Sequence, residues 1–304
     1  MGFGRRFAGL LVGVGLWSGL TGTVSGAINT DTGLTPAEGQ WIVRSQTVFK
    51  SKTDDRTGEN RKLQIIANRN VLIYGLRDGT SLFTAIPFLY KAQEVNSSDG
   101  GRSEREDAGI GDVQVFVKQR LWRQDRLGRT NRLALIGGLE LPTGDTSEAN
   151  GLGKFPRPIQ LGSGSWDPFM GAVATHQEQR YELSADVVYQ FNTEARGFEF
   201  GDALSHDAGL WVRVWPGQLP EWGTPSAIHA VLELNGIFNQ KNTVNGDLVG
   251  DLGGYTLYLS PGIQWVGPRW IVEGSLQFPV IQDLNRAEIR EAGPTYVIGV
   301  RVTF

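Results

Sequence analysis

The chain has 304 residues, of which 41 are glycine and none is cysteine, and its formal net charge at pH 7 is −3. The lack of cysteine excludes a disulfide framework and a thiolate metal site. The slightly acidic balance does not provide the basic surface that a nucleic-acid-binding protein needs, so we expect no nucleic-acid partner.

The first 27 residues have the pattern of a cleaved secretory signal. Arg5 and Arg6 precede an apolar run, and the small residues 25–27 follow it. This order is typical of a signal peptide. A retained membrane anchor is the alternative, but the apolar run is short and rich in glycine for a spanning helix. Residues 28–40 would then form a short periplasmic N-terminal tail.

From residue 41 onward, apolar residues recur at every second position, which is the period of a β-strand. In 181–192, for example, the apolar positions run from Tyr181 to Phe191 with polar residues between them. Twelve such stretches are predicted: 41–51, 62–76, 81–92, 109–122, 132–141, 167–176, 181–192, 204–215, 227–239, 255–266, 270–281 and 294–304.

Two architectures contain alternating strands, a soluble sandwich and a membrane barrel. The predicted strands have roughly 9–12 residues, the length that a tilted membrane-spanning strand requires. Aromatic residues stand at the ends of the apolar stripes, as at Trp41 and Phe49, and short and long connections alternate along the chain. These features are typical of an outer-membrane barrel. We therefore expect an all-β, transmembrane, antiparallel up-and-down β-barrel over 41–304, with periplasmic N and C termini, surrounded by outer-membrane lipid and lipopolysaccharide.

Two of the predicted strands have no clear phase. In 62–76, one phase directs Arg69 toward lipid, and the other directs Gln64, Asn68 and Asn70 toward lipid. A β-bulge near Asn68 could switch the faces. The strand 81–92 is apolar on both faces and contains Pro87, which cannot donate a ladder hydrogen bond. A kink or a local gap in the wall is expected there.

In each predicted strand, the positions between the apolar residues face the lumen, and the charged residues among them are predicted to line it. Six of these are basic and six acidic, so strong selection for one ion sign is not expected. Twelve strands lie between the filled and the open sizes of barrel, so both a narrow polar pathway and a salt-bridged filling remain open. The lumen-lining candidates are Arg44, Lys50, Asp112, Lys118, Arg120, Glu140, Glu182, Asp186, Arg213, Glu233, Glu273 and Arg301.

The longest connection, 142–166, is too long for a passive turn. It could fold inward and constrict the lumen, or it could form an outward crown. Because only 28–40 precede the first strand, we expect gating to come from this loop and not from a folded N-terminal plug.

Catalysis is weakly supported. The three histidines are His176, His206 and His229, and none forms a His-x-Ser motif. The stretch "GSGSW" has only a loose likeness to a nucleophile elbow and lacks the strand-to-helix context. No His, Asp and Glu cluster has metal-ligand spacing. We expect no enzyme activity, cofactor or metal, and a hydrolase site at the barrel rim is the least favoured function.

The stretches "LELPTGDTSEANGLGKFPRPIQLGSGSWDPFMGAVATHQ" and "YQFNTEARGFEFGDALSHDAGL" resemble outer-membrane proteins of the phenol-degradation meta-pathway type. The resemblance implies a barrel that passes small, often aromatic or hydrophobic, compounds. It implies no catalytic residue. The matching loop positions, expected to shape turns and the constriction, are Pro142, Thr143, Gly144, Asp145, Gly162, Gly164, Ser165, Asp167, Gly201 and Asp202.

The final strand ends on Phe304, on the apolar stripe that begins at Tyr296. By resemblance to outer-membrane barrels, a terminal Phe implies recognition by the barrel-assembly machinery. The favoured function is a channel for passive uptake of small organic solutes through a narrow polar lumen. A non-conducting structural or adhesion barrel is the main alternative.

Overall fold

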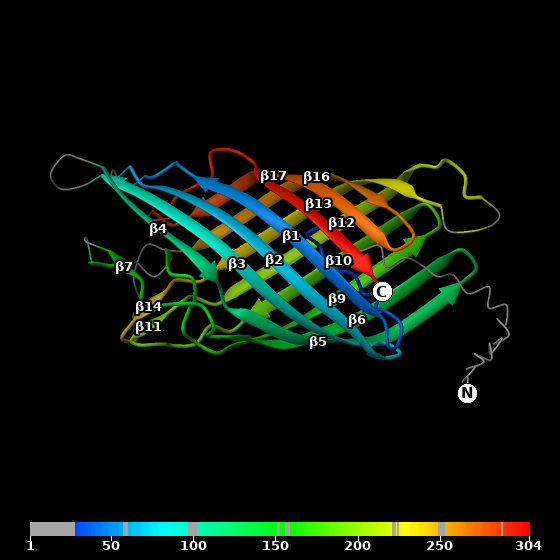
Figure 1. Cartoon of the computed structure of the whole chain (residues 1–304), viewed down its shortest axis with the longest axis horizontal. Coiled ribbons are helices and arrows are strands. Elements are labelled where there is room, and N and C mark those ends of the chain that lie inside the picture. Colours follow the sequence, from blue (N-terminus) through cyan, green and yellow to red (C-terminus); the bar gives the residue numbers. More distant parts are fainter. Residues whose placement is uncertain are drawn as a thin grey trace, which may run out of the picture.

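The alternating segments form the wall of one antiparallel barrel in the computed structural model (Figure 1). The structure describes residues 28–56, 60–96, 102–150, 153–155, 159–220, 223, 225–248, 253–286 and 288–304. The expected signal peptide, 1–27, lies outside them. The wall strands are β1 (Trp41–Lys52), β2 (Lys62–Arg77), β3 (Thr80–Asn96), β4 (Arg102–Ile110), β5 (Val113–Arg126), β6 (Arg129–Leu141), β9 (Asp167–Glu178), β10 (Tyr181–Gln190), β12 (Ala203–Trp215), β13 (Ala227–Asn239), β16 (Gly254–Val266), β17 (Trp270–Leu284) and β18 (Thr295–Thr303).

The sheet closes on itself because the first strand pairs with the last. The β1–β18 register runs from Ile42 opposite Thr303 to Phe49 opposite Tyr296, and β2 pairs with both β1 and β3. Strands β4 and β5 share one place in the wall, beside β3, so the barrel has twelve strand positions. The wall therefore closes as one sheet, in which β4 pairs with β3 and with no other described strand. The predicted all-β, closed antiparallel barrel is confirmed.

Several two-residue strands lie in the long connections: β7 (Ala149–Asn150), β8 (Gly153–Lys154), β11 (Phe198–Glu199), β14 (Thr243–Val244) and β15 (Asp247–Leu248). We call the end of the barrel that carries these connections the loop end. The opposite end, where Trp41 and Phe304 meet through a backbone hydrogen bond of 2.9 Å, is the terminal end. Among the described residues, no helix has the length and apolar character needed to cross a membrane.

Outward and inward faces alternate as the sequence predicts. On β18, Tyr296, Ile298 and Val300 are exposed on the outer surface, whereas Val297 and Arg301 are buried on the inner side. Outward aromatic rings gather at both ends of the wall, with the Trp41 and Tyr74 centroids 4.5 Å apart at the terminal end. This apolar band with aromatic margins is the surface of an outer-membrane barrel.

The ambiguous strand β2 has one continuous phase. Arg69 lines the interior, and Gln64, Asn68 and Asn70 are on the outer face. The β1–β2 register is unbroken from Trp41 opposite Tyr74 to Lys52 opposite Leu63. No bulge interrupts this pair of strands near Asn68, so the faces of β2 do not switch there.

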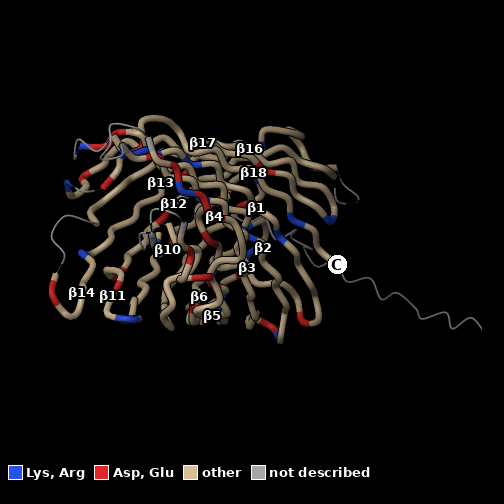
Figure 2. Tube along the Cα trace, turned by 60° about the vertical axis from the view of Figure 1, so that its left-hand side comes forward, with Lys and Arg blue, Asp and Glu red and all other residues tan. Residues whose placement is uncertain are grey.

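The predicted strand 109–122 is interrupted at Gly111 and Asp112. Strand β3 pairs with β5 up to Ala85 and with β4 from Phe88 onward, so the ladder changes partner beside Pro87. The Pro87 carbonyl accepts a 2.9 Å hydrogen bond from Gly111 N. Strand β4 has charged residues at Glu104–Asp107, visible as adjacent red and blue segments in Figure 2. The β3–β4 hairpin is thus polar where it forms part of the loop end.

Candidate transport pathway through the barrel

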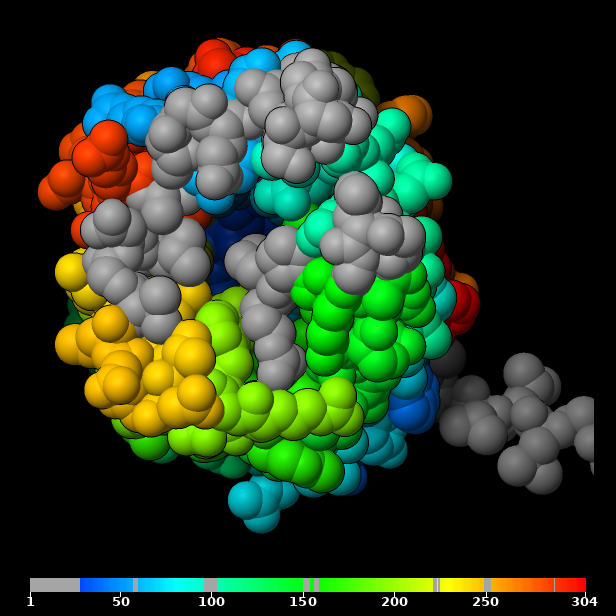
Figure 3. Space-filling view, turned by 90° about the vertical axis from the view of Figure 1, so that its left-hand side faces the viewer, coloured from blue at the N-terminus to red at the C-terminus, as the bar shows by residue number. Residues whose placement is uncertain are grey.

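Residues 28–36, here named the lumen segment, occupy the barrel interior. Viewed from the loop end, the molecule is hollowed between the loops, and blue atoms from the start of the described chain lie at the bottom of the hollow (Figure 3). Ile28 is fully buried against Trp211, Val231 and Val297. Residues 28–40 were expected to form a periplasmic tail, but residues 28–36 lie inside the barrel. Their polar groups form hydrogen bonds with side chains of the inner wall.

Strands from several sides of the barrel bind the lumen segment. The Glu233 carboxylate accepts hydrogen bonds from the backbone N–H groups of Asn29 and Thr30 and from the Asn29 amide at 2.6 Å. Asp31 N donates to Asp186 at 2.7 Å. Thr32 contacts Thr175 on β9 through their hydroxyls. The segment has no regular secondary structure, so these wall contacts hold it in place.

Two basic side chains complete this attachment. Lys118 Nζ lies 2.5 Å from Asp31 Oδ1 and donates to the Thr32 carbonyl at 2.8 Å. Arg44 donates to the Ile28 carbonyl, which also accepts from Gln46 at 2.7 Å. Lys118 is almost completely buried, and a buried cation requires such partners.

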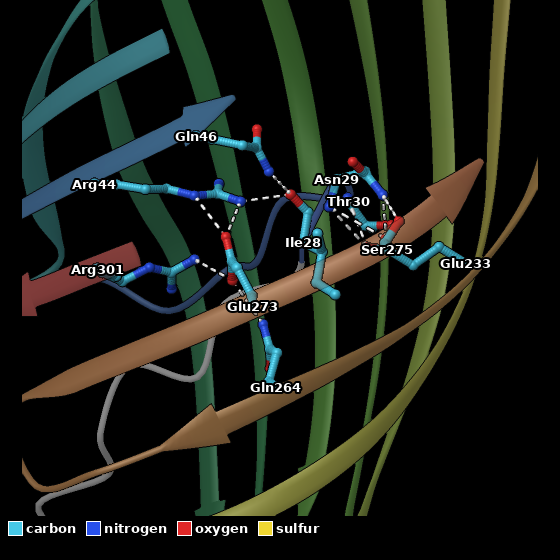
Figure 4. A network of polar contacts seen from close by, with 10 residues as sticks. All are labelled: Ile28, Asn29, Thr30, Arg44, Gln46, Glu233, Gln264, Glu273, Ser275 and Arg301. Carbon is cyan, nitrogen blue, oxygen red and sulfur yellow. Dashed lines mark hydrogen bonds and ion pairs between the residues drawn. The ribbon is translucent and has the colours of Figure 1, made fainter. Parts of the chain in front are cut away.

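Glu273 joins the first and last strands beneath Ile28. Arg44 and Arg301 are direct partners in the β1–β18 register, and both approach this carboxylate, at 2.7 Å and 3.8 Å. Arg44 contacts Oε1 of Glu273, whereas Arg301 approaches Oε2, which also accepts a hydrogen bond from the Gln264 amide at 3.0 Å. Figure 4 shows the two arginines converging on Glu273 while Asn29 and Thr30 reach toward Glu233. The carboxylate separates two like charges that would otherwise repel each other.

A cavity of about 320 Å³ lies against the lumen segment. One side is aromatic: the rings of Phe83 and Phe116 stack with centroids 4.5 Å apart, and Phe169 meets Phe116 edge-on at 5.7 Å. The polar side chains that line the cavity are Asn29, Thr30, Asp31, Thr32, Arg44, Arg69, Gln114, Lys118, Asp186, Gln190, Ser205, Asp207 and Arg301. The size suits a small ligand, and the lining offers both ring stacking and hydrogen bonds.

The long loop 142–166 is fastened to the wall by Asp112, at the β4–β5 break. Its carboxylate accepts from Gly144 N at 2.9 Å, and from Ser163 N and Oγ at 2.6 and 2.9 Å. A Cβ on Gly144 would lie 2.7 Å from the Gly162 backbone, so the crossing of the two loop branches requires glycine. Gln160 is buried, and its backbone carbonyl accepts a hydrogen bond from Lys91, which is on the inward side of β3.

Other residues of the loop motif also hold connections together. Thr143 Oγ1 accepts from Val113 N and donates to the Gly111 carbonyl, each at 2.9 Å. Asp167 accepts from Ser165 Oγ and Thr193 N, and Asp202 accepts from Tyr189 and Asn192 N. Hydrogen bonds from the Ser147 hydroxyl and backbone lower the pKa of Asp145. The motif therefore builds loop structure.

The remaining lumen candidates lie apart from the cavity or at its margin. Lys50 pairs with Glu291 at 3.1 Å near the loop end, and Arg120 pairs with Asp78 at 2.7 Å at the terminal end. Glu140 accepts from Gln114 at 2.7 Å. Glu182 and Arg213 are both buried on inward faces. The structure thus joins Arg44, Lys118, Asp186, Glu233, Glu273 and Arg301 around the lumen segment.

Sequence reasoning missed the lumen segment and the aromatic wall. Phe116 falls on the polar phase of its strand with Gln114 and Lys118, and that was an available signal. The lumen segment has no periodicity that could have placed it. Among the described residues, no group of three His, Cys, Asp or Glu side chains could hold a metal ion.

The fold is similar to that of solved outer-membrane barrels. The COG4313 outer membrane channel of Pseudomonas putida F1 has 14% identity and a TM-score of 0.65, over 89% of this chain and 97% of that chain. The β domain of the Bordetella autotransporter BrkA has 12% identity and a TM-score of 0.43, over 88% and 100%. Likeness at such identity shows the fold alone. No curated protein matched the sequence.

A family model provides the closer assignment. It matches residues 46–280, which is more than half of the chain and runs from within β1 to within β17. The resemblance expected from the loop motifs is confirmed. The chain belongs to the outer-membrane family described as "Putative MetA-pathway of phenol degradation".

Proposed function

We propose that this barrel is an outer-membrane channel for passive uptake of small organic molecules, and that the lumen segment closes it. The observation that carries the proposal is the position of residues 28–36, held across the lumen beside a cavity of about 320 Å³. A barrel that served only as a structural or adhesion element would not need a cavity of this kind. The terminal end, with its short turns, faces the periplasm in this proposal.

The cavity lining supports a substrate that combines an aromatic ring with a polar substituent. The ring would contact Phe83, Phe116 and Phe169, and the substituent would exchange its hydration for Lys118 and the other polar groups. Lys118 Nζ also lies 5.1 Å from the centre of the Phe83 ring, so a cation and an aromatic face are close together. Solutes of this class fit the wording of the family description.

Two closures are possible along this path. Loop 142–166 covers part of the loop end, and the lumen segment blocks the interior. We propose that the segment is the main closure, because its contacts come from β1, β5, β9, β10 and β13. The loop contacts β3 and the β4–β5 junction. Its part in constriction is secondary in this proposal.

Single-channel recording in planar bilayers tests the proposal. Three forms would be compared: the mature chain, a chain lacking 28–36, and a chain lacking 146–163. We expect the chain lacking 28–36 to conduct steadily, and the mature chain to conduct rarely. If none of the three folded forms conducts, the channel proposal fails and the structural-barrel alternative is favoured. If only the loop deletion conducts, the channel stands but the loop is its closure.

A further inference from the structure

Four polar side chains lie together on the outer, lipid-facing wall. Ser45 and Thr47 on β1 stand opposite Asn70 and Asn68 on β2. They are on the outer face because the alternating residues Arg44 and Gln46 bind the Ile28 carbonyl inside the barrel. We name Ser45, Thr47, Asn68 and Asn70 the outer-wall polar patch.

The patch is near mid-depth of the apolar band. Ser45 is four positions from Trp41, in the aromatic margin of the terminal end, and four from Phe49, which stands opposite Tyr296. At about 3.3 Å per residue, each margin is roughly 13 Å away along the strand. Lipid headgroups and water lie at the margins, so neither can hydrate the patch at this depth.

The surroundings of the patch are apolar. Its cross-strand neighbours are Val300 and Ile298 on β18 and Phe88 and Ile86 on β3, all exposed on the outer surface. Val43, Ile66 and Leu72 extend this border along β1 and β2. A polar centre inside such a border is unusual for a surface that only contacts lipid, because the lipid-facing positions of a barrel are apolar.

Hydrogen bonds within the patch satisfy only part of its capacity. The Asn68 amide donates to Ser45 Oγ at 3.2 Å and Thr47 Oγ1 at 2.8 Å, and the Asn70 amide donates to Asn68 Oδ1 at 2.6 Å. Within the described part of the chain, no hydrogen bond uses the side-chain carbonyl oxygen of Asn70 or the hydroxyl protons of Ser45 and Thr47. The patch therefore presents both donors and an acceptor to its surroundings.

We propose that this surface binds a second copy of the same chain, giving a dimer within the membrane. A two-fold axis places a patch against its own copy, and a patch with donors and an acceptor is complementary to itself. Polar side chains join membrane segments in this way, since acyl chains offer no hydrogen bonds. The patch carries no charge, so a partner of opposite charge is not favoured. The dimer is independent of the proposed transport function.

Cysteine cross-linking tests the dimer directly, because the chain has no cysteine. Ser45→Cys, Thr47→Cys, Asn68→Cys and Asn70→Cys would each be oxidised with copper phenanthroline in native outer membranes. Ala185→Cys is the matched control: it is exposed on β10 across the barrel, four positions from Tyr181 as Ser45 is from Trp41. Heat-modifiable mobility would identify the folded variants, and only those would be scored.

We expect at least one patch position to form covalent dimer at five times or more the yield of Ala185→Cys. Dimer yields equal to the control at every folded patch position would overturn the proposal, as would adducts with a different protein. A second measurement uses native mass spectrometry of the chain in nanodiscs. The variant N68L/N70L, which makes the patch apolar, should lose the dimer, whereas A185L should keep it. A dimer that persists in N68L/N70L would contradict the assigned surface.

Discussion

Lys118 on β5 and Asp31 in the lumen segment form an ion pair inside the barrel, with Nζ and Oδ1 2.5 Å apart. The lysine is almost fully buried, and about a third of the aspartate side chain is exposed (35%). A cation on the wall therefore fixes a carboxylate on the segment that fills the lumen. A substitution of Lys118 removes this ion pair and the hydrogen bond to the Thr32 carbonyl. It leaves the contacts of the segment with Glu233, Asp186 and Thr175 in place.

Lys118→Met should favour the open channel. Methionine is also unbranched and apolar but carries no charge, so the Asp31 carboxylate loses its ion pair with Lys118. Hydration of this carboxylate outside the barrel then becomes more favourable than its burial in the lumen. The pair is only partly shielded, so we expect about 1–2 kcal/mol, or roughly a tenfold higher open probability. Single-channel recording measures this directly. Lys91→Met, which removes a lysine at the loop instead, is the control. Equal open probabilities in Lys118→Met and the native chain would remove this ion pair from the closing contacts.

Asp112→Ala should release loop 142–166 from the wall. Three hydrogen bonds to the carboxylate are lost, and at about 1 kcal/mol net for each, the loop should open locally far more often. The readout is trypsin cleavage at Lys154 in intact cells, followed by mass spectrometry. Asp145→Ala is the control, since the hydrogen bonds described for that carboxylate come from Ser147 in the same loop. Cleavage no faster than in the control would show that Asp112 does not hold the loop.

Phe304 should govern assembly more than stability. The ring is 72% exposed, and its backbone N–H already closes the barrel to the Trp41 carbonyl. Replacing Phe304 with alanine therefore removes little packing and keeps this backbone hydrogen bond. If the barrel-assembly machinery recognises the terminal aromatic, the folded amount in outer membranes should fall several-fold, while refolding of purified chain in detergent should change little. A parallel loss in both measurements would indicate an ordinary structural role for Phe304.

The wall strands were predictable because lipid imposes a strict alternation. On β18, Tyr296 and Ile298 face out and Arg301 faces in, and a period of two identifies both faces without any tertiary information. Strand β2 broke that rule because Asn68 and Asn70 lie on the lipid side. A pattern that takes apolar residues to face lipid cannot assign a strand whose outer face carries polar side chains, such as Asn68 and Asn70.

The interior was predictable only in part, for a different reason. Inward charges such as Glu233 and Glu273 follow from strand phase, but their partners depend on the three-dimensional arrangement of strands far apart in sequence. Asn29 and Glu233 are 204 positions apart, and their contact exists only in the closed barrel. The lumen segment takes its conformation from these contacts, so its own sequence could not indicate that it turns into the barrel.

Phe116→Ala should change which solutes the channel passes. The Phe116 ring lies between Phe83 and Phe169, so its loss removes the centre of the aromatic wall and enlarges the cavity. Ring stacking contributes about 0.5–1.5 kcal/mol beyond area burial, and we expect aromatic solutes to lose roughly threefold to tenfold in uptake relative to aliphatic solutes of equal size. Swelling of liposomes that contain the chain lacking 28–36 measures both classes under one condition. Val117→Ala, at the adjacent outward position, is the control and should alter neither rate. An equal change for aromatic and aliphatic solutes would mean that Phe116 sets the width of the path and does not select rings.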